Sequence, residues 1–314
     1  MVGQGDLPGG QSGSNALGVS ADGSVVVGRG HSTASGLGLL TEAFRWTSAT
    51  GMVGLGDIPG GNFNSEAYAA PGSGATVVGV GSRTTSSLTE AFRWTPAGGM
   101  VGLGSMPGGS NYSAAFDASA DGNLVVGFSS NGQFSQAATW SLATGWLGLG
   151  VLPGHGSSRA RAVSSDGQVI VGWSTGSGEI QAFRWTLTTG MLAQGDLPGG
   201  ETASFAFDLS DDGSVIVGFG VSDSGGEATI WDPMNGMRSL RTVLSTEYGL
   251  NVNGWSLTQA YGISGDGRVI TGYGVNPSGQ TEAWVAVIPE PNTLILLILG
   301  VAGFQYSCNR KKRR

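Results

Sequence analysis

The sequence predicts an all-β protein, a six-bladed β-propeller, and three observations lead to this prediction. One tryptophan-containing phrase recurs about every 46 residues, a period typical of repeat architectures, at Trp46, Trp94, Trp140, Trp185, Trp231 and, in a shortened copy, Trp284. Each copy contains four short strand-like segments separated by turn signals. Only 12% of the residues are charged and 58 are glycine, which is typical of short strands joined by tight turns. Four strands per copy at this period are typical of propeller blades.

The first copy shows the four segments in order. Residues 1–7 are expected to form a strand that ends in the turn Leu7-Pro8-Gly9-Gly10. Residues 15–20 alternate, which puts Leu17 and Val19 on one face and small residues on the other. We expect this strand to be the innermost one, with its narrow face toward a central channel. An Asp-Gly turn at residues 22–23 then leads into an apolar strand, and the last segment ends at Trp46.

The two ends of the repeat region are expected to meet. Residues 1–7 align with an outermost strand, whereas residues 254–264, 268–274 and 282–288 form three strands that lack a fourth. We therefore predict that the N-terminal strand completes the last blade, closes the ring and covers an edge that would otherwise invite aggregation. One departure is expected at about residues 238–250, where apolar residues and a glycine stop predict a short helix. The propeller would then occupy residues 1–288.

Charge and cysteine content exclude some functions. The formal net charge is −7, and residues 310–314 carry five positive charges, so the rest of the chain carries −12 (−7 − 5). Such an acidic body repels a phosphate backbone, which argues against nucleic acid as a partner. The single cysteine, Cys308, allows neither a disulfide framework nor a cysteine-based zinc site.

Residues 1–288 resemble the HAF repeat, an extracellular repeat of bacteria. Its hallmark is His-Ala-Phe-x-Trp, then Gly-Met-x-x-Leu-Gly, then Ser-x-Asp-Gly, and residues 42–46 and 51–56 match the first two parts in order. The resemblance implies an extracellular location. This chain departs at the histidine, whose position holds Glu42, Glu90, Gln136, Gln181, Glu227 and Glu282. Any metal-binding or catalytic role of that histidine in relatives therefore does not carry over.

Residues 289–314 resemble the PEP-CTERM sorting signal, because three parts follow one another in the expected order. The first is Pro289-Glu290-Pro291, the second is an apolar segment over residues 294–304, and the third is a basic cluster. The residues that carry the second and third parts are Leu294, Leu297, Leu299, Phe304, Arg310, Lys311, Lys312, Arg313 and Arg314. The resemblance implies that an exosortase recognises the first part and cleaves there.

The physical character of this tail agrees with a transient contact with the inner membrane. Eleven apolar residues in a helix span roughly 17 Å, against a hydrocarbon core of about 30 Å. The basic cluster would stay on the cytoplasmic side and leave the body outside. A permanent single-pass transmembrane helix is the alternative. Export also needs a secretory signal, and residues 1–6 have neither its basic nor its apolar region, so we expect further sequence upstream of Met1.

A few residues are candidate ligand-binding positions. Asp117 and Asp208 replace small residues on the narrow face of the innermost strand, near Arg159 or Arg161, where they would either face a channel ligand or hydrogen-bond the next blade. The recurring tryptophans are expected to pack between blades. In contrast, Trp146 and Trp173 fall outside that register and are candidate aromatic platforms. The aspartates of the Asp-Gly turns are expected to cap their own turns rather than bind calcium.

The sequence contains no recognisable catalytic constellation. Its two histidines, His31 and His155, stand alone, so neither a triad nor a histidine metal site is predicted, and no cofactor motif is present. We therefore expect an exported cell-surface or biofilm-matrix protein that acts as a structural or binding module, with exopolysaccharide as one candidate partner. Two alternatives stay open: a propeller enzyme that acts on polysaccharide through Asp117 and Asp208, and a membrane-tethered scaffold that is never cleaved.

Overall fold

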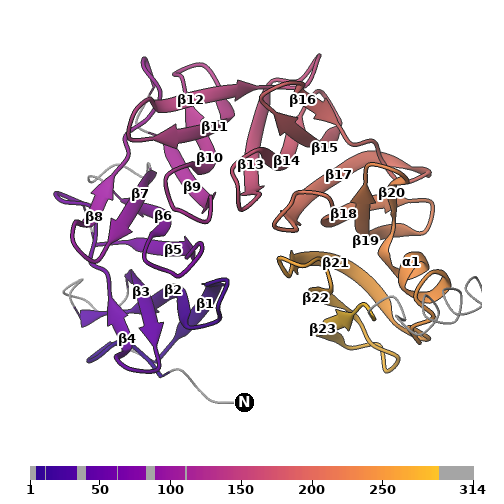
Figure 1. Cartoon of the computed structure of the whole chain (residues 1–314), viewed down its shortest axis with the longest axis horizontal. Coiled ribbons are helices and arrows are strands. Elements are labelled where there is room, and N and C mark those ends of the chain that lie inside the picture. The colour runs from indigo at the N-terminus through magenta and orange to yellow at the C-terminus, as the bar shows by residue number, and fades with distance from the viewer. Residues whose placement is uncertain are drawn as a thin grey trace, which may run out of the picture.

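The computed structural model describes residues 5–10, 12–33, 40–61, 63–82, 89–109 and 112–289. The chain is nearly all β, and its strands form antiparallel groups that follow one another around an arc (Figure 1). Among the described residues, five groups have four strands and one has three. A single parallel bridge between Ile180 and Ala203 joins the fourth and fifth groups into one eight-stranded sheet, but each group is called a sheet below. The innermost strands of the sheets face the centre of this arc (Figure 1). The repeated sequence phrase thus produces a repeated sheet.

The sheets have the following strands. The first sheet contains β1 (Ser14–Val19), β2 (Val25–His31), β3 (Thr41–Thr47) and β4 (Gly51–Gly54). The second contains β5 (Ser65–Ala69), β6 (Val77–Ser82), β7 (Thr89–Thr95) and β8 (Gly99–Gly102). The third contains β9 (Ser113–Ala118), β10 (Val125–Ser130), β11 (Ser135–Ser141) and β12 (Gly145–Gly150). The next two are β13 (Ser157–Val163), β14 (Val169–Thr175), β15 (Ile180–Thr186) and β16 (Gly190–Ala193), and β17 (Gly199–Leu209), β18 (Ile216–Ser222), β19 (Gly225–Asp232) and β20 (Gly236–Ser239). The last is β21 (Ser256–Ile263), β22 (Val269–Val275) and β23 (Thr281–Val287).

The Asp-Gly turns connect the first and second strands of the sheets as predicted. In the third sheet, Asp121 Oδ1 accepts hydrogen bonds from Ser119 Oγ at 2.6 Å and from the Asn123 N–H at 3.0 Å, and Gly122 has a φ of +67°. Such a turn needs a short acceptor side chain followed by a residue that tolerates positive φ. The same hydrogen bonds lower the pKa of Asp22 to about 2 in the first sheet. These aspartates are therefore capping residues.

The recurring phrase packs one sheet against the next. Phe44, Phe92 and Phe183 of the third strands are almost fully buried. Trp94, Trp140, Trp185 and Trp231 are partly buried and pack against core clusters, and Trp284 is buried within one. The prediction that the recurring tryptophan is a packing residue is confirmed at these five positions.

Buried serines connect neighbouring sheets through hydrogen bonds. Ser113 Oγ accepts the Ala91 N–H of the preceding sheet at 3.0 Å and donates to the Gly104 carbonyl at 2.6 Å. The same two bonds are made by Ser65, Ser158 and Ser204. All four serines are at most 1% exposed, and each satisfies one backbone N–H and one backbone carbonyl group.

The short helix is found where the sequence predicted it. Helix α1 (Leu240–Thr246) buries Leu240, Val243 and Leu244 in a core cluster with residues of the last sheet. It lies beside the last two sheets (Figure 1). The apolar spacing at these positions was therefore a sound helix signal.

The predicted N-terminal strand over residues 1–7 is wrong in its extent. Gly5, Asp6 and Leu7 are not in a strand, and Met1 to Gln4 lie outside the described residues. Gly5 has a φ of +79°, close to the +80° of Gly56, which follows strand β4 in the first copy. Glycine tolerates this positive φ, and Gly5 is therefore not in an extended strand conformation.

The ring is not closed within the part of the chain that the structure describes. No strand pairs with β23 on its outer edge, so the last sheet has three strands. Of the predicted sorting segment, only Pro289 is described, and Glu290 to Arg314 lie outside the described residues. No described helix is long and apolar enough to cross a membrane.

Candidate functional site

Every innermost strand contains a β-bulge at the same place. One residue of the strand has no partner in the neighbouring second strand, and the pairing register shifts by one across it. The unpaired residues, here called the bulge residues, are Leu17, Tyr68, Phe116, Arg161, Phe207 and Tyr261. A bulge re-aims side chains and is often found beside functional sites.

A glycine in the second strand makes each bulge possible. Gly127 pairs with Ala115, and a Cβ atom at Gly127 would lie 1.9 Å from the Ala114 carbonyl oxygen. The equivalent glycines meet a carbonyl oxygen at 1.9 to 2.0 Å: Gly28, Gly79, Gly172, Gly218 and Gly272. These glycines are required by the close approach of two backbones, because none of them adopts a positive φ.

All six bulge residues line one cavity of about 570 Å³ at the centre of the arc, which we call the channel mouth. A second cavity of about 720 Å³ shares Asp117 and Asp208 with it and extends to the Asp-Gly turns of the first and last sheets. The sequence placed only the narrow face of the innermost strand at the channel. Large residues reach it as well, because a bulge adds one residue and breaks the alternation.

Four aromatic residues line the channel mouth: Tyr68, Phe116, Phe207 and Tyr261. The rings of Phe207 and Tyr261 lie 5.1 Å apart with an interplanar angle of 25°, and Tyr261 and Tyr273 lie 5.9 Å apart at 26°. On the other side of Arg161, the rings of Tyr68 and Phe116 lie 5.5 Å apart. Half of the Tyr261 side chain is exposed (50%). The mouth therefore presents flat apolar surfaces to solvent.

Arg161 lies between these aromatic groups in the mouth, and Arg159 lies near it on the same strand. The Arg161 guanidinium lies 4.9 Å from the centre of the Phe116 ring, and that of Arg159 lies 4.7 Å from the Phe128 ring. Burial lowers the pKa of Arg161 from its usual value, whereas nearby Asp117 acts in the opposite direction. Within the described residues, neither guanidinium donates a hydrogen bond or forms an ion pair.

Asp117 and Asp208 connect the innermost strands of neighbouring sheets. Asp117 accepts the Ala118 N–H at 2.8 Å and the Val163 N–H of the next sheet at 3.0 Å. Asp208 likewise accepts N–H groups of Leu209 at 2.9 Å and of Ile263 in the next sheet at 2.8 Å. Of the two roles that the sequence left open, the structure shows the hydrogen bond to the next blade.

Burial changes the acidity of both carboxyl groups. It raises the pKa of Asp117 to about 7 and that of Asp208 to about 6, while the backbone hydrogen bonds act in the opposite direction. Both side chains line the channel mouth, but each carboxyl oxygen already accepts a backbone N–H. Such carboxyl groups are poorly placed to transfer protons to a ligand.

The two candidate tryptophan platforms differ. Trp146 is only 5% exposed, and its Nε1 donates to the Leu103 carbonyl oxygen of the neighbouring sheet at 3.0 Å. It is therefore a packing residue, and its proposal as a platform was wrong. Trp173 is partly buried and contacts Phe207 edge to face, with 6.3 Å between the ring centres. It thus supports a bulge residue of the channel mouth.

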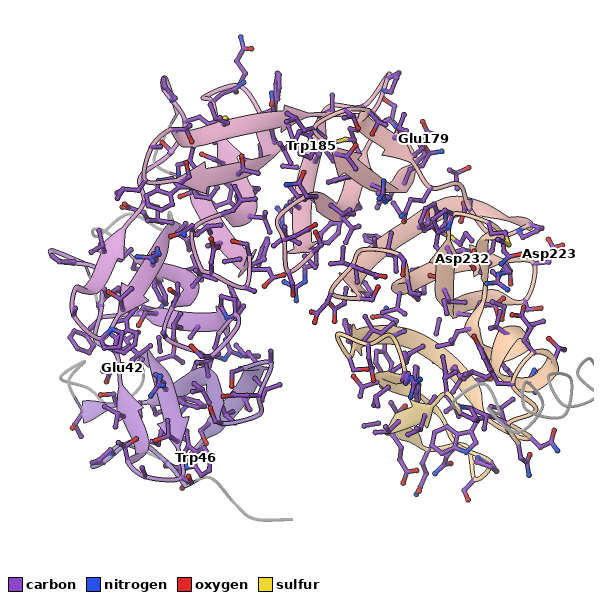
Figure 2. All side chains as sticks on the ribbon, viewed as in Figure 1. Glu42, Trp46, Glu179, Trp185, Asp223 and Asp232 are labelled. Carbon is purple, nitrogen blue, oxygen red and sulfur yellow. The ribbon has the colours of Figure 1, made fainter. Side chains whose placement is uncertain are left out.

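The glutamates that replace the histidine of the HAF phrase lie far from this site. Glu42 and Glu90 are buried and accept the N–H groups of Gly56 at 3.0 Å and Gly104 at 2.8 Å. Figure 2 shows Glu42 and Trp46 away from the centre of the arc. No group of three His, Cys, Asp or Glu side chains in the described ranges could hold a metal ion.

Comparisons with known proteins show the fold. No family model and no curated protein matches the chain. The chain is similar to TolB from Acinetobacter baumannii, with a TM-score of 0.54 and 12% sequence identity. The match covers 84% of this chain and 64% of the TolB chain. A putative TolB from Agrobacterium tumefaciens has the same TM-score and 15% identity over 88% of this chain and 90% of its own. These likenesses support the β-propeller fold and nothing beyond it.

We predict that G127A destabilises the protein. The added methyl group would meet the Ala114 carbonyl oxygen and force the bulge open, and overpacking of this kind costs about 1–3 kcal/mol. Urea unfolding followed by tryptophan fluorescence measures the change. The control is G156A, because nothing lies within 4 Å of a Cβ atom there. Equal stability of the two variants would contradict the role given to the second-strand glycine.

We also predict that stability falls as the pH rises from about 4 to about 7. The folded-state pKa values of Asp117 and Asp208, about 7 and about 6, exceed the ordinary value of 3.8, so the native state holds more protons in this range. Thermal unfolding midpoints at a series of pH values measure the effect. The slope should be shallower in D117N and unchanged in D121N, because the pKa of Asp121 is lowered and it titrates below this range. An unaltered slope in D117N would refute the assignment.

Proposed function

We propose that the protein is an exported cell-surface or extracellular-matrix module that binds its ligand at the channel mouth. The observation that carries this proposal is the set of six bulges, which direct the side chains of six separate strands into one cavity. Tyr68 and Phe116 also pack against a small core cluster between two sheets, whereas Leu17 and Tyr261 are 44% and 50% exposed. Concave sites lined by aromatic groups with a few polar ones are typical of ligand binding.

The proposal includes a closed ring of six blades. Residues 5–13 repeat the connection that follows β4: Ser14 Oγ donates to the Gly5 carbonyl at 3.0 Å, as Ser65 Oγ does to Gly56 at 2.7 Å. Asp6 accepts the Gly13 N–H at 3.1 Å, as Asp57 accepts a backbone N–H seven residues on. A connection of this kind follows a fourth strand elsewhere in the chain, so in this proposal the closing strand precedes residue 5, pairs with β23 and covers its open edge.

The C-terminal segment supplies the cellular address in this proposal. The similarity of residues 289–314 to the PEP-CTERM signal supports recognition by an exosortase at Pro289-Glu290-Pro291, brief insertion of the apolar part into the inner membrane, and cleavage. The exosortase is thus the expected protein partner. The uncleaved membrane-tethered scaffold is the alternative that the second experiment below addresses.

The first experiment tests binding and separates it from catalysis. The full chain is passed over immobilised exopolysaccharide fractions, and we expect retention without release of shorter products. Y261A should lose retention, because it removes the most exposed aromatic bulge residue, whereas Y248A, beyond helix α1, should keep it. Equal retention of both variants would contradict the site. Turnover that D208N abolishes would instead identify the polysaccharide-active enzyme.

The second experiment tests sorting. We expect mass spectrometry of the protein recovered from the cell surface or medium to show a chain that ends near Pro289, without Cys308 and the basic cluster. An intact tail in membrane fractions only would show the tethered scaffold. In that event the binding site is unaffected, because every residue of the channel mouth lies within residues 17–271.

A further inference from the structure

Arg161 lines the channel mouth together with Asp117 and Asp208, and two further arginines lie nearby. Arg29, Arg159 and Arg161 lie on the two inner strands of their sheets, beside or within the aromatic groups of the mouth. Arg29 forms an ion pair with Glu66, whose other carboxylate oxygen accepts the Tyr68 hydroxyl at 3.1 Å. This carboxylate is therefore already neutralised. Arg159 and Arg161 have no such partner among the described residues.

The unpaired arginines have hydrogen-bond donors to offer. A guanidinium carries five N–H groups in its plane, and a ring stacked on its face leaves all of them free. Asp117 and Asp208 are the two carboxyl groups whose charge acts on the pKa of Arg161, but both accept backbone N–H groups instead of pairing with it. A partly buried guanidinium without acceptors gains from a ligand carboxylate, which it can bind through two parallel hydrogen bonds.

The aromatic groups beside Arg161 define the rest of the ligand. Phe207, Tyr261 and Tyr273 form a nearly parallel series of rings, and Tyr68 and Phe116 form a second surface on the opposite side. Pyranose rings present flat faces of C–H groups that pack on aromatic rings. A chain of uronic acids combines such a face with one carboxylate on every sugar. An acidic peptide carries its carboxylates on flexible stems and presents no flat face of this kind.

We propose that the channel mouth binds an acidic polysaccharide built of uronic acids. Arg161, assisted by Arg159, binds a sugar carboxylate, and Phe207 and Tyr261 pack against the neighbouring sugar ring. This inference rests on the proposed binding function and adds the chemical class of the ligand. The attraction is local to Arg161, because Asp117 and Asp208 in the same mouth already accept backbone N–H groups and acidic residues such as Glu179 and Asp223 lie at the outer rim (Figure 2).

The test compares two tetrasaccharides that differ only at C6. Titration calorimetry of the full chain uses β-1,4-linked tetramannuronate and β-1,4-mannotetraose. We expect tetramannuronate to bind at least about tenfold more tightly, since charge-assisted hydrogen bonds are the strong ones, and to lose affinity as salt increases. R161Q should remove this advantage without changing the weak binding of mannotetraose. The matched control is R241Q, which replaces an exposed arginine on helix α1. This variant should bind as the unaltered protein does.

The possible failures are distinguishable. Equal affinity for the two tetrasaccharides, or an R161Q variant that keeps the preference, would overturn the acidic ligand while the binding module stands. Absence of binding to every saccharide, together with no retention on exopolysaccharide, would overturn the binding module as well. Tighter binding of a poly-glutamate peptide than of tetramannuronate, lost in R161Q, would replace the sugar with an acidic peptide. Circular dichroism of R161Q excludes misfolding as the cause of lost affinity.

Discussion

The approach of the first two strands in each sheet is the contact on which this structure depends. A carbonyl oxygen of the innermost strand lies so close to the second strand that only a glycine fits opposite it, as at Gly28 and Gly127. That approach creates the bulge, and the bulge turns one side chain of each sheet toward the centre. Architecture and site thus follow from one backbone contact that is repeated six times.

Polar side chains carry much of the connection between sheets. The buried serines each satisfy two backbone groups, and the first-copy arginine of the phrase, Arg45, donates to the Gly74 carbonyl of the next sheet at 3.2 Å. Asp117 and Asp208 add bonds between innermost strands. Because hydrogen bonds are directional, they fix the orientation of each sheet against the next. Apolar packing alone would leave this orientation less well defined. The charged side chains Arg45, Asp117 and Asp208 therefore stabilise contacts between sheets.

The channel mouth differs from the rest of the molecule in this respect. Arg159 and Arg161 lack acceptors within the described residues, and the rings of Phe207, Tyr261 and Tyr273 contact one another while Tyr261 is half exposed. The stability of the fold does not require an unpaired guanidinium beside a half-exposed tyrosine, because a partly buried charge without a partner costs free energy. Side chains that are positioned accurately and yet left unsatisfied are those expected where a ligand completes the environment.

Much of the architecture could be predicted from local sequence signals. The Asp-Gly turns, the apolar second strands, the packing role of the recurring tryptophans and the helix at residues 240–246 depend on short-range conformational preference and periodicity, which are written in neighbouring residues. The bulges, the packing of Trp146 and the bonding of Asp117 were decided by tertiary structure. Each depends on which backbone from a distant part of the chain lies opposite. Strict alternation places Phe116 and Asp117 on opposite faces, and only the cross-strand register at Gly127 brings both to the channel.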